Sequence, residues 1–188
     1  KFMREMQTQG EVSFREFCLP KDMPEFCRAC FTCILRDEKL CPHASYIQPI
    51  LSAMLKADAL IFTTPVYVLS ASGGMKAFLD HFGFMFYVHR ARPEMFHKKA
   101  FILSTTAGAG TKSAMKTIAT SLKYWGINRV YSRGFVMHHI KWDAMPLKKK
   151  ERYEKTLRTD AVKFFHAVSS QKPCAPYFNT RFMFFMIK

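Results

Sequence analysis

Four cysteines are the residues with the clearest capacity for chemistry, and they stand at Cys27, Cys30, Cys33 and Cys41. They fall within fifteen residues, whereas a disulfide framework spreads its cysteines along the chain. In a reducing compartment, thiols crowded in this way indicate metal binding or redox chemistry. Because no secretory signal pattern opens the sequence, we expect a cytoplasmic protein whose thiols stay reduced.

Two segments have the composition of ligand-binding loops. Each follows a short continuous apolar run, at residues 58–63 and 100–105, typical of strands buried on both faces of a parallel sheet. Ligands of such sheets bind beyond the carboxyl ends of the strands. Small and hydroxyl residues let backbone amides approach a polar ring edge, and a tyrosine can lie against an aromatic face. The candidate residues are Thr64, Pro65, Val66 and Tyr67 in the first loop and Thr106, Ala107, Gly108 and Gly110 in the second.

Strands and helices alternate along the chain around these segments. Helical periodicity predicts helices over residues 1–9, 46–57, 75–82, 114–125 and 146–168. Strand patterns cover residues 11–19, 58–63, 100–105 and 127–137, and residues 21–42 form a loop that carries the cysteine cluster. This alternation predicts an α/β fold in which helices cover both faces of a parallel sheet.

The overall composition describes one globular domain with a strong positive charge. Of 188 residues, 49% are apolar, which supports a core of ordinary size and argues against disorder. The 29 lysines and arginines exceed the 14 acidic residues and give a formal charge of +15. That charge favours anionic ligands and raises nucleic acid as a partner. The longest apolar run, seven residues, is far shorter than the ~20 that a spanning helix needs.

Two blocks of sequence resemble a known enzyme family. Residues 57–67, ADALIFTTPVY, and residues 74–80, GMKAFLD, resemble the ADAIIFGSPVY and MKAFLDR pattern of flavodoxin-like NAD(P)H-dependent FMN reductases. Residues 89–110 and 125–126 are similar to the later strand and loop of that family. The resemblance covers about residues 11–140. It implies a flavodoxin-like three-layer sandwich that binds FMN and takes NAD(P)H as substrate.

The resemblance also implies how the chain is organised around the flavin. The first candidate loop would border the isoalloxazine ring, and the second would close its other edge. The family's serine-rich turn for the FMN phosphate is not found here, so we expect that turn and the first strand to precede Lys1. The flavin-binding domain would span residues 1–170, and an apolar tail at 171–188 would pack on it or on another subunit. Family members commonly self-associate, which implies a homodimer or a higher homo-oligomer.

The cysteine spacing is similar to the compact motif of iron-sulfur flavoproteins, a branch of the same family. Cys27-x2-Cys30-x2-Cys33-x7-Cys41 would supply thiolates to three corners of a [4Fe-4S] cubane and a fourth to close it. A structural zinc site generally uses two separated pairs of ligands rather than a triplet and a singlet. Zinc and free thiols nevertheless stay open as alternatives at these residues.

These features predict an FMN-dependent oxidoreductase. It would pass electrons between NAD(P)H, or a reduced carrier, and a small acceptor or electron-carrier protein, with a [4Fe-4S] cluster as one-electron partner where one is bound. Arg90 and Arg92 are candidates for a nucleotide phosphate or are simply solvated. His138 and His139 are expected on opposite faces of a strand, unable to share a metal. The alternative function is a basic nucleic-acid-binding module with zinc at the cysteines.

Overall fold

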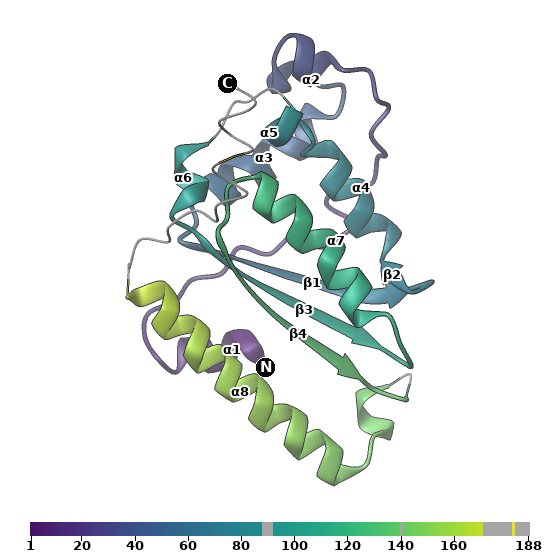
Figure 1. Ribbon diagram of the computed structural model, residues 1–188, viewed down its shortest axis with the longest axis vertical. Helices are drawn as coiled ribbons and strands as arrows, with labels where there is room; N and C mark the ends of the chain where they lie inside the picture. Colours follow the sequence, from purple (N-terminus) through teal and green to yellow (C-terminus); the bar gives the residue numbers. More distant parts are fainter. Residues whose placement is uncertain (88–91, 140, 171–181, 183–188) are drawn as a thin grey trace.

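A mostly parallel sheet organises the fold (Figure 1). The computed structural model describes residues 1–87, 92–139, 141–170 and 182. Within them, β1, β3 and β4 run parallel, and β2 pairs antiparallel with the end of β1. The α/β fold expected from the sequence is confirmed. The strands, in the sheet order β2-β1-β3-β4, are β1 (Ala59–Tyr67), β2 (Ser70–Ala71), β3 (Lys99–Thr106) and β4 (Arg129–Val136).

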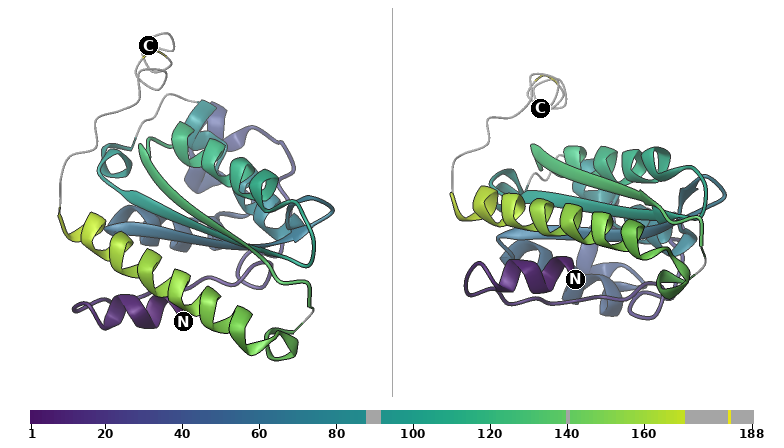
Figure 2. Two further views of the ribbon diagram at one scale, coloured as in Figure 1. Left: turned by 60° about the horizontal axis from the view of Figure 1, so that its bottom comes forward. Right: turned by 90° about the horizontal axis from the view of Figure 1, so that it is seen from below.

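Helices cover both faces of the sheet (Figures 1 and 2). One face carries α3 (Ala44–Lys56), α4 (Gly73–His81) and α7 (Thr111–Tyr124). The other carries α1 (Phe2–Gln7) and α8 (Leu147–Ser169). Helix, sheet and helix make the three layers of the expected sandwich. Short helices lie in the connections: α2 (Thr32–Leu35), η1 (Glu38–Leu40), α5 (Phe84–Tyr87), α6 (Pro93–Phe96) and η2 (Trp142–Ala144).

Two hydrophobic cores flank the sheet because successive side chains of a strand point to opposite faces. Ala100 and Ile102 of β3 pack with residues of α3, α4 and α7 in the larger core. Phe101 packs in the smaller core with Phe2 of α1 and Phe164 of α8. The ring centroids of Phe101 and Phe164 lie 5.4 Å apart. Burial on both faces explains why this strand is a continuous apolar run in the sequence.

The segment over residues 11–19 is not a strand, and the sequence prediction is wrong here. Phe14 packs against the smaller core, whereas Phe17 and Leu19 pack against the larger one. Burial of these side chains attaches the segment to the domain, and its backbone forms no strand pairing with the described sheet. The alternation of apolar residues therefore reflects two buried faces without a backbone partner.

The first candidate loop is the end of a strand rather than a free loop. β1 continues to Tyr67, and Val66 and Tyr67 pair with Ala71 and Ser70 of β2. Pro65 pairs with Thr105 of β3 on one side, whereas β2 pairs with β1 only at Val66 and Tyr67. The other side of Pro65 therefore has no strand partner in the described sheet, and a residue without an amide hydrogen is tolerated there. The sequence predicted that this strand ends at residue 63, whereas in the structure it continues to Tyr67 and forms a hairpin with β2.

Some sequence predictions fall outside the described residues. The apolar tail at 171–188, apart from Phe182, is among them, and so is Arg90. Among the helices that the structure describes, none combines the length and apolar character needed to cross a bilayer.

Phe164→Ala tests the smaller core. The ring is fully buried between α8 and the sheet, so its loss should lower the free energy of unfolding by about 3–5 kcal/mol. Leu147→Ala on the same helix is the control, because that side chain is 75% exposed and its loss should change stability by less than about 0.5 kcal/mol. Urea unfolding followed by circular dichroism measures both. Equal losses in the two variants would contradict the assigned packing of α8.

Candidate active site

The register of the parallel strands brings three strand ends to one edge of the sheet. Pro65 of β1 pairs with Thr105 of β3, which pairs in turn with Phe135 of β4. All three strands end one or two residues beyond this row, so the segments that follow them lie side by side (Figure 1). The two candidate loops are therefore neighbours, as the sequence predicted.

At Gly110 the second candidate loop lies against the β1–β2 hairpin. The φ of this residue is +100°, a left-handed conformation that glycine adopts without steric cost. A Cβ added there would lie 2.7 Å from Cγ1 of Val66 and 2.9 Å from Cα of Leu69. The glycine thus lets the second loop touch the β1–β2 hairpin, and the two form one continuous surface.

Two threonine hydroxyls shape this surface from inside. The Thr64 hydroxyl is buried, donates to the Pro65 carbonyl at 3.0 Å and accepts from the Ser72 amide at 3.1 Å. The Thr106 hydroxyl donates to the Ala109 carbonyl at 2.7 Å and accepts from the Gly108 amide at 3.3 Å. Both hydroxyls are therefore engaged in holding the backbone of their own loops.

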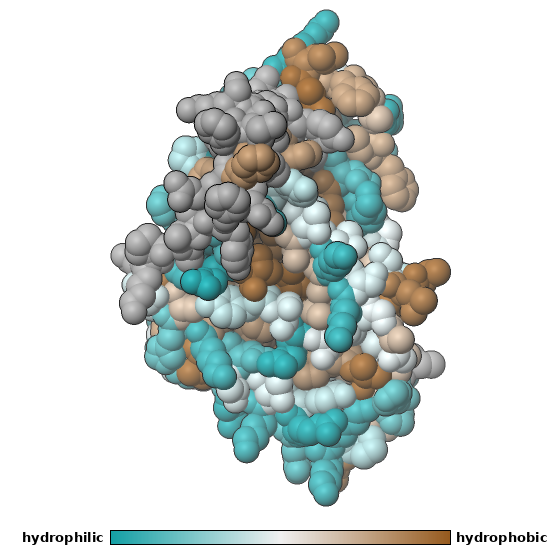
Figure 3. All heavy atoms as spheres, viewed as in Figure 1, coloured by the Kyte–Doolittle hydropathy of each residue, from teal (hydrophilic) through white to brown (hydrophobic). Residues whose placement is uncertain are grey.

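The exposed part of the surface is flat and mostly apolar. Pro65 and Tyr67 are exposed from the hairpin, and residues 107–109 from the second loop. Val68 and Leu69, at the hairpin tip, are 98% and 64% exposed and have left-handed φ values of 48° and 60°. Figure 3 shows hydrophobic side chains gathered at this hairpin and again over α2. An aromatic ring system could lie against such a surface and meet backbone polar groups at its edge.

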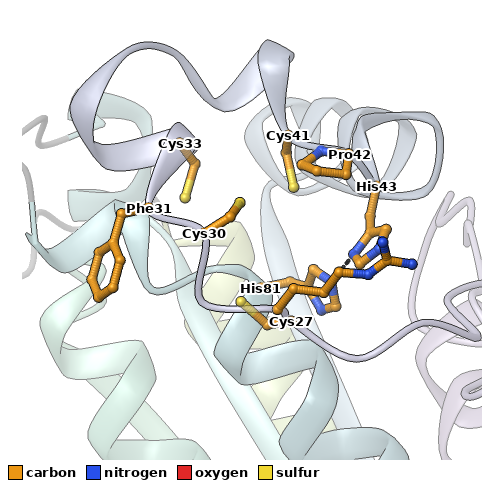
Figure 4. Close-up of a pocket in the computed structure, with 9 residues that line it drawn as sticks. Cys27, Cys30, Phe31, Cys33, Cys41, Pro42, His43 and His81 are labelled. Carbon is orange, nitrogen blue, oxygen red and sulfur yellow. Dashed lines mark hydrogen bonds between the residues drawn. The ribbon is translucent and has the colours of Figure 1, made fainter.

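The four cysteines of the sequence motif surround one small pocket (Figure 4). Cys27 and Cys30 come from the chain before α2, Cys33 from α2, and Cys41 from the residue after η1. Every described cysteine is a free thiol. The structure therefore brings together all four of the predicted metal ligands, although no three His, Cys, Asp or Glu side chains in its described part are placed to hold one metal ion.

The thiols of this pocket have different acidities. A hydrogen bond from the Thr32 side chain, with a second from its backbone, lowers the pKa of the exposed Cys30 thiol. Burial raises the pKa of Cys33 and of Cys41, and neighbouring thiols raise both further. In the free-thiol state Cys30 therefore has a larger thiolate fraction at neutral pH than Cys33 or Cys41, because its pKa is lowered and theirs are raised.

A buried histidine pair forms the wall of the pocket, and sequence analysis missed it. His81 Nδ1 lies 2.9 Å from the Ala77 carbonyl, which can only accept, so this nitrogen carries the proton. His81 Nε2 then accepts from His43 Nδ1 at 2.9 Å. His43 Nε2 is left with a bare lone pair, buried and without a partner in the described structure. Burial, followed by His81, lowers the pKa of His43 and keeps it neutral.

Comparison with known proteins shows which family this chain belongs to. The sequence matches the NADPH-dependent FMN reductase family over residues 1–141. The chain belongs to this family. It is therefore an oxidoreductase that works with FMN and a nicotinamide nucleotide, which confirms the sequence prediction at that level.

Solved structures share the fold of this reductase. The apo form of an NADH:FMN oxidoreductase, EMOB, is 20% identical with a TM-score of 0.60, and the match covers 96% of this chain and 82% of that one. An FMN-dependent NADH-azoreductase from Bacillus anthracis str. Ames Ancestor, solved with FMN, is 11% identical with a TM-score of 0.64, covering 87% and 88%. FerB, an NAD(P)H:(acceptor) oxidoreductase from Paracoccus denitrificans, is 15% identical with a TM-score of 0.55, covering 90% and 88%. None of the curated proteins matches the sequence.

Of three further sequence predictions, one is not supported and two stay predictions. The zinc-containing nucleic-acid module is not supported, given the family and the lack of a single-ion site among the described residues. The iron-sulfur branch stays a prediction, because the match is to the family as a whole. The homodimer also stays a prediction.

An open surface hollow lies beside the second loop of the reductase, lined by His138, His139, Lys141 and Ala144. The Met137 amide donates to the Thr106 carbonyl at 2.7 Å, and the His138 amide to the Ala107 carbonyl at 3.1 Å. β4 ends at residue 136, and His138 is left-handed with φ 57°. The strand alternation expected for the two histidines therefore does not apply, and both line the same hollow.

Gly110→Ala tests the contact between the two loops. The added Cβ would force the hairpin away in a strained backbone, so we expect a loss of about 1–3 kcal/mol in stability and weaker FMN binding. Gly73→Ala is the matched control, since nothing lies within 4 Å of a Cβ there and the position opens α4. Urea unfolding and flavin fluorescence titration measure the two effects. FMN affinity unchanged by Gly110→Ala would refute the joint surface.

Proposed function

We propose that the protein oxidises NAD(P)H through FMN bound on the joint surface of the two loops and reduces a small acceptor. The observation that carries this is the contact of Gly110 with Val66 and Leu69, which joins both family loops at the carboxyl edge of the sheet. FMN held there would supply hydride acceptance and the release of electrons in pairs or singly. The protein's own part is to bind, orient and shield the ring.

Each candidate residue has a distinct part in this proposal. Pro65 and Tyr67 offer exposed apolar surface for one side of the ring, and Val66 supports them from beneath. The small side chains of Ala107 and Gly108 let the backbone of the second loop approach the ring edge. Thr64 and Thr106 hold the two backbones in place through their hydroxyls. Hydride transfer needs no protein acid or base, and none is assigned.

A [4Fe-4S] cluster at the cysteine pocket is a second candidate function. It is favoured by the convergence of Cys27, Cys30, Cys33 and Cys41 on one pocket whose wall includes the unpartnered His43 Nε2. One zinc ion needs four sulfurs only about 3.8 Å apart, as tetrahedral bonds of 2.3 Å require. A cubane presents four separate irons and suits more widely spaced thiols. A cluster bound there would supply one-electron exchange.

The surroundings of the pocket are compatible with taking up a cluster. The pocket now has room for only about 20 Å³, so the chain must open to admit one. Residues 27–31 are exposed and irregular, and Ala29 and Phe31 have left-handed φ values of 50° and 56°. A segment with so few buried contacts can widen at small cost in packing.

The FMN proposal is tested by flavin content and turnover. We expect one FMN per chain in the purified protein or after reconstitution, and NADPH oxidation that depends on an added quinone or free flavin. Tyr67→Ala should weaken FMN binding by about 2–10-fold through loss of ring contact, whereas Tyr67→Phe should retain it. Titration of flavin fluorescence and absorbance at 340 nm measure binding and turnover. Absence of both flavin binding and NADPH oxidation would refute the proposal.

The cluster proposal is tested by anaerobic purification with iron and sulfide quantitation. We expect about four iron and four sulfide per chain, with a broad brown absorbance beside the flavin bands. Cys33→Ser should lose the iron, whereas Cys18→Ser should keep it, because Cys18 is exposed and lies outside the pocket. The cluster proposal is refuted if the native protein contains no iron. It is also refuted if Cys33→Ser retains its iron.

A further inference from the structure

We propose that His43 is a ligand of the iron-sulfur cluster, which is then held by three cysteines and one imidazole. The inference rests on the cluster proposed for the cysteine pocket and names a ligand that lies outside the cysteine motif. It starts from His43 Nε2, a buried nitrogen that has no hydrogen-bond partner in the described structure and belongs to the wall of that pocket (Figure 4). Buried polar atoms without a partner are rare in folded proteins and call for an explanation.

Two hydrogen bonds fix which nitrogen of His43 carries the free lone pair. The Ala77 carbonyl takes the Nδ1 proton of His81 at 2.9 Å, and His81 Nε2 then accepts from His43 Nδ1 at 2.9 Å. A proton on His43 Nε2 would add a buried positive charge near Arg28, which lines the same pocket. The lone pair of His43 is therefore oriented by α4, in the way that a second residue commonly orients a metal-binding histidine.

Two kinds of occupant could satisfy this nitrogen. No thiol in the described part of the chain donates to it. The pocket has room for about 20 Å³, enough for one water molecule. Iron is the other occupant, because neutral imidazole and thiolate are both common ligands of iron. A water explains the free lone pair but not the convergence of four thiols beside it, so the set of donors favours iron.

Packed structure holds three of the five donors in place. Cys33 and Cys41 pack against the larger core, and His43 is 5% exposed at the start of α3. Cys27 and Cys30 instead lie in the exposed segment before α2. A cubane needs four ligands, one for each iron. The fixed group of Cys33, Cys41 and His43 thus requires one ligand from the exposed segment, and the other cysteine of that segment is spare.

A buried ion pair fixes the connection between Cys33 and Cys41. Glu38 of η1 is buried, and its carboxylate pairs with the Arg92 guanidinium at the start of α6. Arg92, a sequence candidate for a nucleotide phosphate, is therefore engaged with this connection instead. The ion pair holds η1, and with it Cys41, against the domain beside His43.

A mixed ligand set also makes the cluster less negative. Each thiolate contributes one negative charge, whereas a neutral imidazole contributes none. Histidine ligands in place of cysteine raise the reduction potential of iron-sulfur centres. A cluster held by three cysteines and His43 would therefore accept an electron more readily than one held by four cysteines, which suits an acceptor of single electrons from FMN.

Pulsed electron paramagnetic resonance of the reduced cluster tests the ligand in the unaltered full chain. We expect hyperfine coupling to a directly bound nitrogen, which should change from the ¹⁴N to the ¹⁵N pattern when the histidines are labelled with ¹⁵N. His43→Cys should keep the iron, abolish the nitrogen coupling and shift the reduction potential to a more negative value. His166→Gln is the matched control and should change none of these, because that exposed histidine lies on α8 and outside the pocket.

Single cysteine substitutions test the spare ligand by iron quantitation. With His43 as a ligand, at least one of the variants Cys27→Ala and Cys30→Ala should retain the iron of the native protein, and the double variant should lose it. A cluster held by all four cysteines predicts instead that each single variant loses its iron.

The outcomes separate this inference from the proposed cluster. Bound iron and sulfide without coupling to a histidine nitrogen overturn the role of His43 and leave the cluster in place. Loss of iron from both Cys27→Ala and Cys30→Ala, in variants with native circular dichroism, has the same meaning. A native protein that holds no iron after anaerobic reconstitution overturns the cluster and the role of His43 together, whereas FMN-dependent oxidation of NAD(P)H is measured separately and is affected by none of these results.

Discussion

The register of three parallel strands is the constraint on which the proposed flavin surface depends. Pro65, Thr105 and Phe135 form one row across the sheet, and each strand ends just beyond it. Residue pairing in a sheet fixes where strands end, so three unrelated stretches of sequence reach one edge together. A shift of one residue in β3 would turn its core side chains to the wrong face and separate the loops.

Close contact then converts neighbouring loops into a single binding surface. Gly110 removes the side chain that would hold the loops apart, and the hydroxyls of Thr64 and Thr106 satisfy backbone groups inside each turn. Residues that look suited to touching a ligand are thus used to fix the backbone. The exposed part of the surface is left to Pro65, Tyr67 and the small residues after Thr106.

Sequence alone gave the architecture more readily than the sites. Continuous apolar runs identified β1 and β3 because side chains from both faces of these strands pack in the two cores. Residues 11–19 also send side chains into both cores but pair with no strand of the described sheet, so their pattern was mistaken for a strand. The loops and the cysteines were found because their spacing is local. The partnership of His43 with His81 was not, since 38 positions separate them and only the fold joins them. His138 and His139 line the same surface hollow because His138 has a left-handed backbone conformation, which no local sequence pattern predicts.

Helix α4 connects the two chemical regions of the molecule. At its start, Ser72 caps the helix and its amide donates to Thr64 at the flavin edge. At its end, His81 orients His43 at the cysteine pocket. The helix has nine residues and spans about 14 Å, so it separates the two regions and fixes their relative position. Since Phe78 and Leu79 anchor α4 in the larger core, neither end of the helix can shift without disturbing that core.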